Sequence, residues 1–128
     1  MLKEIETTED VANLVYMFYA KVYEDTLLAP IFRDVAQINL ADHIPTMISF
    51  WESVLLGTKS YHNNPYQIHQ VLHQKYPLSE DHFTRWVLLF HATIDEYFHG
   101  ELAEKAKLAA DRISTSMQMG FVNPLRAL

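Results

Sequence analysis

The sequence of 128 residues contains no cysteine at all. It therefore cannot form a disulfide, bind a metal through thiolates or use a cysteine nucleophile, and this composition fits a reducing compartment. Glycine occurs only three times, which disfavours a β protein rich in turns. Acidic residues outnumber basic ones, and the formal net charge of −6 argues against nucleic-acid binding, which needs a basic surface.

The sequence also lacks any run of about 18 apolar residues, the length that a membrane-spanning helix requires. Residues 1–6 include acidic side chains where a signal peptide would have an apolar run. We therefore expect a cytoplasmic protein that does not enter the membrane. Its length predicts one domain over residues 1–128, in which residues 121–128 form a tail without a clear helical pattern.

Apolar residues recur at helical spacing along most of the chain, which predicts an all-α fold. Thr7 or Thr8 can cap a first helix that ends near residues 24–25. The apolar stretch 27–32 contains Pro30 and is expected to be a tight connector with one short helical turn.

A second helix is expected to carry residues 43–55. Pro45 should lie within its first turn, where the missing N–H group costs nothing. Gly57 should follow its end, in the position that helices most often give to glycine.

The second half of the chain predicts three further helices. A short one starts at Asn64-Pro65 and ends at Pro77, Ser79 caps the next, and Gly100 separates that helix from the last, which covers residues 102–117. The helix after Ser79 is expected to bury these apolar side chains: Phe83, Trp86, Val87, Phe90 and Ile94.

Two histidines stand on the short helix. His69 and His73 are four positions apart, so they share one helical face. They can be a simple surface pair, or part of a zinc site, although two histidines are too few and no glutamate follows His69 as in zinc hydrolases. A third interpretation is that one of them binds a haem iron.

A haem needs a flat apolar slot, one axial ligand and suitable polar groups on the other side of the ring. Tyr19 and His43 are polar residues on otherwise apolar helical faces, and each alone is more often a satisfied core residue. Together with a candidate axial histidine they favour the haem interpretation. The side chains that can line the slot are Phe18, Phe32, Met47, Trp51 and Trp86.

An ordered set of short motifs resembles the third group of truncated haemoglobins. The motifs are residues 18–19 with 27–32, residues 43–45 with 50–51, and residues 77–78 with 82–86. They cover roughly residues 5–120. The resemblance implies a globin-like two-over-two helical sandwich around haem b.

The resemblance also implies roles for single residues. Tyr19 matches the tyrosine that stabilises the bound ligand, His43 the distal histidine and Trp86 the distal tryptophan. Phe32 matches the aromatic residue that packs on the porphyrin edge, and Met47, one turn after His43, would also face the haem.

The resemblance allows two assignments of the residue that binds the iron. Counting forward from Pro65 favours His69, whereas counting back from residues 77–78 and 82–86 favours His73. The loop before this helix changes length more easily than the motif after it. We therefore expect His73 to bind the iron, with His69 as the alternative beside the haem.

A neutral imidazole on haem iron leaves one position open for O₂, NO or CO. Tyr19 and the indole N–H of Trp86 can donate hydrogen bonds to such a ligand, each contributing roughly 1–3 kcal/mol in a dry site. Slow O₂ release suits redox chemistry better than delivery. His43 can move protons, because imidazoles ordinarily titrate near neutral pH.

Two classes of function follow. One is a haem oxidoreductase that converts nitric oxide to nitrate or reacts with peroxide. The chain contains no flavin or nicotinamide domain, so this class needs a separate reductase. The other is a non-enzymatic protein that binds O₂ for storage, scavenging or sensing. A helical protein whose histidines bind zinc or nothing is a third possibility.

Overall fold

The computed structural model describes residues 2–35, 40–59 and 78–122. These residues form α1 (Thr8–Glu24), η1 (Ile31–Val35), α2 (Leu40–Leu56), α4 (Glu80–Tyr97), α5 (Glu101–Met117) and η2 (Gln118–Val122), where η marks a π-helical turn. Within them the one β-type pairing is an isolated bridge between Lys3 and Phe98. The all-α prediction is confirmed.

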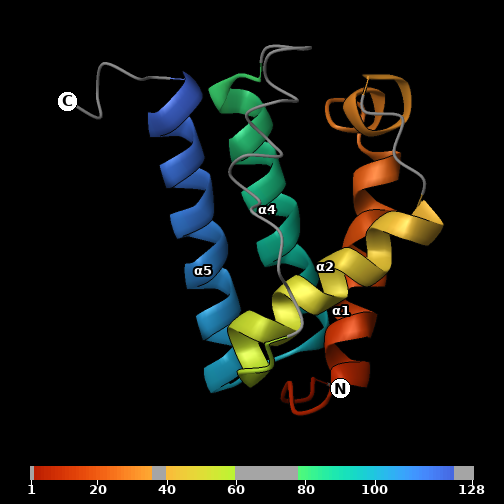
Figure 1. Ribbon diagram of the computed structural model, residues 1–128, viewed down its shortest axis with the longest axis vertical. Helices are drawn as coiled ribbons and strands as arrows, with labels where there is room; N and C mark the ends of the chain where they lie inside the picture. The colour runs from red at the N-terminus through yellow and green to blue at the C-terminus, as the bar shows by residue number, and fades with distance from the viewer. Residues whose placement is uncertain (1, 36–39, 60–77, 123–128) are drawn as a thin grey trace.

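The helices pack as two pairs. α4 and α5 lie side by side, and α2 crosses α1 obliquely (Figure 1). α1 contacts both α2 and α4, and α2 also contacts α5, so one pair lies on the other. The short helix predicted between residues 64 and 77 lies outside the described residues.

The predicted first helix begins and ends where the sequence indicates. Thr7 caps α1: its hydroxyl accepts a hydrogen bond from the Asp10 backbone N–H at 3.2 Å. The Asp10 carboxylate in turn accepts one from the Thr7 N–H at 3.1 Å. This reciprocal capping satisfies two of the N–H groups that a helix start leaves unpaired.

The other predicted boundaries are also confirmed. Ser79 is the cap residue of α4, and Gly57 follows α2 with a φ of +72°. Gly100 precedes α5 with a φ of +100°, and a Cβ there would come within 2.7 Å of Glu4 Oε1. The positive φ favours glycine at this position, whereas the exposed side chain of Glu4 could move away from a Cβ.

The prediction for Pro45 is wrong. α2 begins at Leu40, so Pro45 lies in its second turn and not in the first. There its ring replaces the N–H that would bond the carbonyl of Ala41. The helix tolerates this because Pro45 is exposed, so its ring displaces no core side chain.

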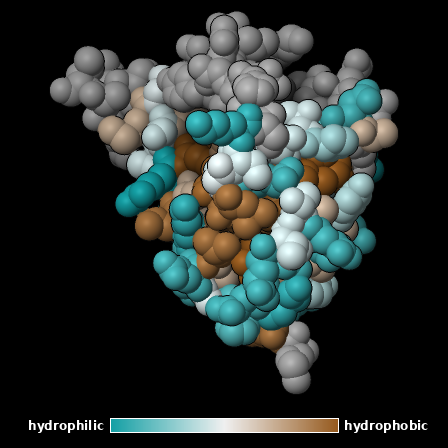
Figure 2. Space-filling view, turned by 60° about the horizontal axis from the view of Figure 1, so that its bottom comes forward, coloured by the Kyte–Doolittle hydropathy of each residue, from teal (hydrophilic) through white to brown (hydrophobic). Residues whose placement is uncertain are grey.

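Most of the apolar side chains face a common interior. The largest fully buried side chains are Phe90, Leu14, Ile94, Val11, Val15, Val22 and Thr93. On the face shown in Figure 2, hydrophilic side chains surround a smaller apolar area. None of the described helices is long and apolar enough to cross a membrane.

One detail of the core differs from the sequence prediction. Trp86 and Val87 are only partly buried, whereas Phe83, Phe90 and Ile94 are buried as expected. On α5 the buried positions are held largely by small residues, Ala103, Ala106 and Ala110, while Leu108 is 48% exposed.

Candidate functional site

A hydrogen bond joins Tyr19 on α1 to His43 on α2. Tyr19 Oη lies 2.9 Å from His43 Nε2, and the two rings meet edge-on with centroids 5.2 Å apart. Tyr19 continues the buried face of Val15 and is only 6% exposed. His43 stands in the first turn of α2. The fold therefore brings together two of the residues that the sequence singled out.

The direction of this hydrogen bond depends on the tautomer of His43. When Nε2 carries the proton, His43 donates to Tyr19 Oη, and the phenolic hydrogen is available to a third group. When Nδ1 carries it, Tyr19 donates to His43 instead. The pair can thus present an O–H donor only in the first arrangement.

Tyr19 remains protonated at any ordinary pH. Burial raises its pKa well above the usual value for a tyrosine, and the nearby Tyr23 adds to this effect. The residue therefore acts as a neutral hydroxyl and not as a phenolate.

Trp86 belongs to an aromatic stack beside this pair. Its ring lies parallel to that of Phe90 with centroids 5.6 Å apart, and Phe90 stacks on Trp51 at 4.6 Å. Phe18 meets Trp86 edge-on at 5.7 Å. Trp51 is 4% exposed and lies in the core, whereas Trp86 is at its border. The stack fixes the orientation of the Trp86 ring.

Phe32 lies against the tyrosine. The two rings meet edge-on with centroids 5.8 Å apart, so Tyr19 contacts Phe32 as well as His43. Met47, one turn after His43 on α2, is partly buried and packs against the core. Tyr19, His43 and Phe32 thus form one contact group.

The apolar interior of the described residues divides into two clusters. The larger draws on α1, α2, α4 and α5, and the smaller consists of Ile31, Leu78, Phe83 and Met117. Phe32 and Ile113 are only partly buried and pack against both. Phe32, beside Tyr19, therefore connects the two clusters.

A haem fits this set of residues. It would meet apolar and aromatic side chains together with a neutral hydroxyl and an imidazole, which are the kinds of group that surround a haem ligand site. The candidate iron ligands His69 and His73 lie outside the described residues. In the described part of the chain, no group of three or more histidine, aspartate or glutamate residues could hold a metal ion.

Sequence reasoning missed an ion pair beside the site. Arg85 Nε lies 3.3 Å from Asp25 Oδ1, and the other oxygen of Asp25 accepts hydrogen bonds from the N–H groups of Leu27 and Leu28. Arg85 directly precedes Trp86, so the pair ties this part of α4 to the connector after α1. The motif 82–86 contained the arginine but could not name its partner.

Sequence reasoning also missed Tyr23. It follows Tyr19 by four positions and therefore shares its helical face. Its hydroxyl is buried and has no hydrogen-bond partner among the described residues. Its ring lies 6.2 Å from that of Phe32.

Comparisons with known proteins agree with this arrangement. The model of the family described as bacterial-like globin matches residues 2–119. The group 3 truncated hemoglobin ctb of Campylobacter jejuni is 27% identical over 113 residues, which cover 86% of this chain and 87% of that protein. The crystal structure of the group III truncated hemoglobin from Campylobacter jejuni has a TM-score of 0.82 at 26% identity, covering 94% of this chain and 95% of the other. The expected two-over-two globin sandwich is confirmed.

Proposed function

The chain belongs to the bacterial-like globin family. We propose that it is a haem b protein that binds O₂, NO or CO, and that it serves redox chemistry in which bound O₂ reacts with nitric oxide or the haem reacts with peroxide. Membership of a globin family implies haem-based binding of small ligands. In this proposal His73 binds the iron, with His69 as the alternative, and the protein works in the cytoplasm. The haem is held without covalent bonds, because thioether attachment requires cysteine and the chain has none.

The contact between Tyr19 and His43 carries the proposal. A bound haem supplies an iron atom with one open position for a diatomic ligand. With its proton on Nε2, His43 would donate to Tyr19 Oη, 2.9 Å away, and would leave the phenolic hydrogen free for such a ligand. Because burial raises the pKa of Tyr19, its hydroxyl keeps its hydrogen throughout the physiological pH range.

Trp86 supplies a second donor. Its indole N–H points to the ligand in this proposal, and the stack on Phe90 keeps the ring from turning away. A hydrogen bond of this kind contributes roughly 1–3 kcal/mol in a dry site. Two such donors slow the release of O₂, which carries partial negative charge, much more than that of CO.

The redox reaction we propose is the conversion of nitric oxide to nitrate. One NO and one O₂ combine with one electron to give one nitrate ion. A separate reductase supplies the electron. His43 moves protons when peroxide is the substrate, the second reaction that this pocket supports.

The second candidate function is non-enzymatic binding of O₂ for storage or sensing. Tyr19 and Trp86 also favour this function, because their hydrogen bonds stabilise bound O₂ without any supply of electrons. Sustained turnover separates the two candidates.

The experiment mixes the O₂-saturated, haem-loaded protein with nitric oxide in the presence of a reductase fraction from the source organism. We expect nitrate to form over many turnovers with the reductase and over no more than one without it. A single turnover in both reactions would contradict the enzymatic proposal and favour the O₂ binder. The rate of the first turnover alone decides nothing, because oxygenated globins in general react quickly with nitric oxide.

A further inference from the structure

The connector after α1 folds around one carboxylate. Asp25 directly follows the last residue of α1, and its Oδ2 accepts hydrogen bonds from the N–H groups of Leu27 and Leu28, at 3.1 and 3.0 Å. The carbonyl of Leu28 in turn accepts one from the N–H of Phe32 at 3.3 Å. Asp25 therefore shapes the turn that leads to Phe32, whose ring contacts Tyr19 in the candidate site.

The other oxygen of the same carboxylate contacts α4. Arg85 Nε lies 3.3 Å from Asp25 Oδ1, and the side chain of Asp25 is only 10% exposed. A charged, well-buried acceptor with donors on both of its oxygens has little freedom to move. The distance between the connector and α4 is therefore set at Arg85, the residue that precedes Trp86.

The aromatic stack alone leaves one property of Trp86 open. Its ring is parallel to that of Phe90 to within 5°, which fixes the plane of the indole. Stacked rings are nevertheless found over centroid distances of about 4.5–7 Å, because such contacts do not fix how far one ring slides along the other. Where the indole N–H points therefore also depends on where α4 lies relative to the connector.

A second ion pair joins the same two helices at another point. Lys21 Nζ on α1 lies 2.7 Å from Glu96 Oε2 on α4, and the two side chains are 31% and 50% exposed. Glu96 is about three helical turns along α4 from Trp86. Exposed pairs of this kind contribute little to stability. The Lys21–Glu96 pair thus provides a comparison in which α1 and α4 are linked away from the indole.

We propose that Arg85 and Asp25 are positioning residues: their ion pair holds α4 against the connector, so that the indole N–H of Trp86 stays directed at the ligand in the pocket of Tyr19 and Phe32. The proposal rests on the proposed function, since the ligand is the one bound at the haem. Arg85 and Asp25 act through Trp86.

Two single variants break the pair in the haem-loaded protein. Arg85→Gln removes the charge. Asp25→Asn keeps an oxygen for the N–H groups of Leu27 and Leu28 and presents an amide N–H₂ to Arg85. Each should increase the O₂ dissociation rate by about threefold, the partial loss of one hydrogen bond. The double variant should release O₂ no faster than either single one, because both changes break one contact. Arg85→Lys keeps the charge and should restore part of the effect.

Two further measurements separate positioning from a general loss of structure. In a Trp86→Phe background, Arg85→Gln should have no additional effect on O₂ release. The chain has two tryptophans, so the CO-saturated, diamagnetic protein gives two indole N–H signals in NMR. Arg85→Gln should shift the signal of Trp86 and leave that of Trp51 in place.

Lys21→Gln is the matched control, because it breaks the other ion pair between α1 and α4. It should lower the urea midpoint by a small amount similar to that of Arg85→Gln. Its O₂ dissociation rate and its Trp86 signal should be those of the wild type. Far-UV circular dichroism of every variant shows whether the fold is retained.

The outcomes distinguish this proposal from the proposed function. Faster O₂ release in Arg85→Gln and Asp25→Asn, absent without Trp86, supports the positioning role. A wild-type rate in both variants, an equal acceleration in Lys21→Gln, or a full effect of Arg85→Gln in the Trp86→Phe background would each overturn it alone. A wild type that takes up no haem or binds no O₂ would overturn the proposed function, and this proposal with it.

Discussion

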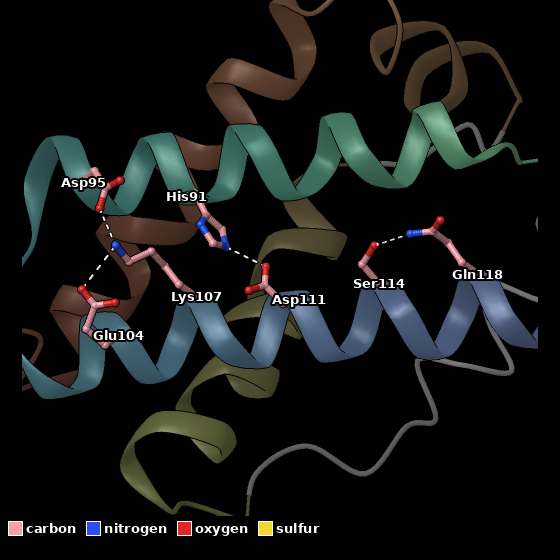
Figure 3. A network of polar contacts seen from close by, with 7 residues as sticks. All are labelled: His91, Asp95, Glu104, Lys107, Asp111, Ser114 and Gln118. Carbon is pink, nitrogen blue, oxygen red and sulfur yellow. Dashed lines mark hydrogen bonds and ion pairs between the residues drawn. The ribbon is translucent and has the colours of Figure 1, made fainter.

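Polar side chains are used differently on α1 and along the outer edge between α4 and α5. On α1 the polar residues Asp10 and Tyr19 are buried, at 4% and 6% exposure. Along α4 and α5 a row of polar contacts lies mostly near the surface, with the buried Ser114 as the exception, and Figure 3 shows it. This α4–α5 network consists of His91, Asp95, Glu104, Lys107, Asp111, Ser114 and Gln118.

Each region has one histidine in a hydrogen bond across two helices. His43 Nε2 lies 2.9 Å from the neutral hydroxyl of Tyr19, and His91 Nε2 lies 2.8 Å from the carboxylate of Asp111. The distances are nearly equal, but the side chain of Asp111 is 47% exposed. Water competes with the contact between His91 and Asp111 but is largely excluded from the contact between His43 and Tyr19. We therefore expect only the contact between His43 and Tyr19 to affect the reaction at the haem.

The largest effect is expected from His43→Leu. Without the imidazole the site loses its candidate proton carrier. General acid–base catalysis commonly accelerates a reaction by a factor of about a hundred or more. The reaction of the haem-loaded ferric protein with hydrogen peroxide should slow by about that factor in stopped-flow measurements. The matched variant His91→Leu should react like the wild type. Equal slowing in both would remove the distinction between the two histidines.

Tyr19→Phe should increase the O₂ dissociation rate by about tenfold or more, because one strong hydrogen bond is worth about 1.4 kcal/mol or more. CO dissociation should change less, since bound CO carries little charge. Flash photolysis and ligand replacement measure both rates. Tyr16→Phe, on the exposed side of the same helix, is the control. An equal change for O₂ and CO would mean that Tyr19 acts through its shape.

Asp10→Ala should lower the free energy of unfolding by about 1 kcal/mol at neutral pH, as the loss of a helix cap does. Burial acts to raise the pKa of Asp10, but hydrogen bonds from Lys3, Glu6 and Thr7 outweigh it and hold the pKa below its usual value. Because the pKa is lower in the folded state, the ionised carboxylate stabilises the fold at a pH above the unfolded-state pKa of about 3.9. This contribution disappears as the pH falls through the folded-state pKa.

The difference between wild type and Asp10→Ala should therefore shrink as the pH falls below about 4. Urea denaturation from pH 7 to pH 3 measures it. A difference that stays constant over this range would show that Asp10 stabilises α1 without its charge.

The smallest effect is expected in the α4–α5 network. Asp111→Asn should change the free energy of unfolding by about 1 kcal/mol or less, because exposed ion pairs contribute little and salt screens them. Denaturation at low and high ionic strength checks this. A loss of several kcal/mol, or a change in O₂ release, would mean that the network supports the site.

Local signals in the sequence predicted local structure well. Thr7, Ser79, Gly57 and Gly100 act through neighbours a few positions away, so helix boundaries follow from short stretches. Pro45 was placed wrongly because a proline in the second turn is tolerated when its surroundings are exposed, and exposure is a property of the folded chain.

Contacts between residues that are far apart in the sequence could not be predicted from local signals. Tyr19 and His43 were each singled out, but they are 24 positions apart and their bond depends on how α1 meets α2. The burial of the Tyr23 hydroxyl, which has no partner among the residues that the structure describes, depends equally on packing, and so does the pair of Arg85 with Asp25. The assignment of the iron to His73 stays a prediction from the spacing of sequence motifs.

Titration of the cysteine-free chain with hemin tests the central claim most directly. We predict a Soret band that saturates at one haem per chain, and after reduction the spectrum of a five-coordinate ferrous haem with one imidazole. His73→Ala should lose that ferrous spectrum and His69→Ala should keep it. The opposite pattern would move the ligand to His69, and absence of a Soret band at stoichiometric hemin would contradict the account of this protein as a haem globin.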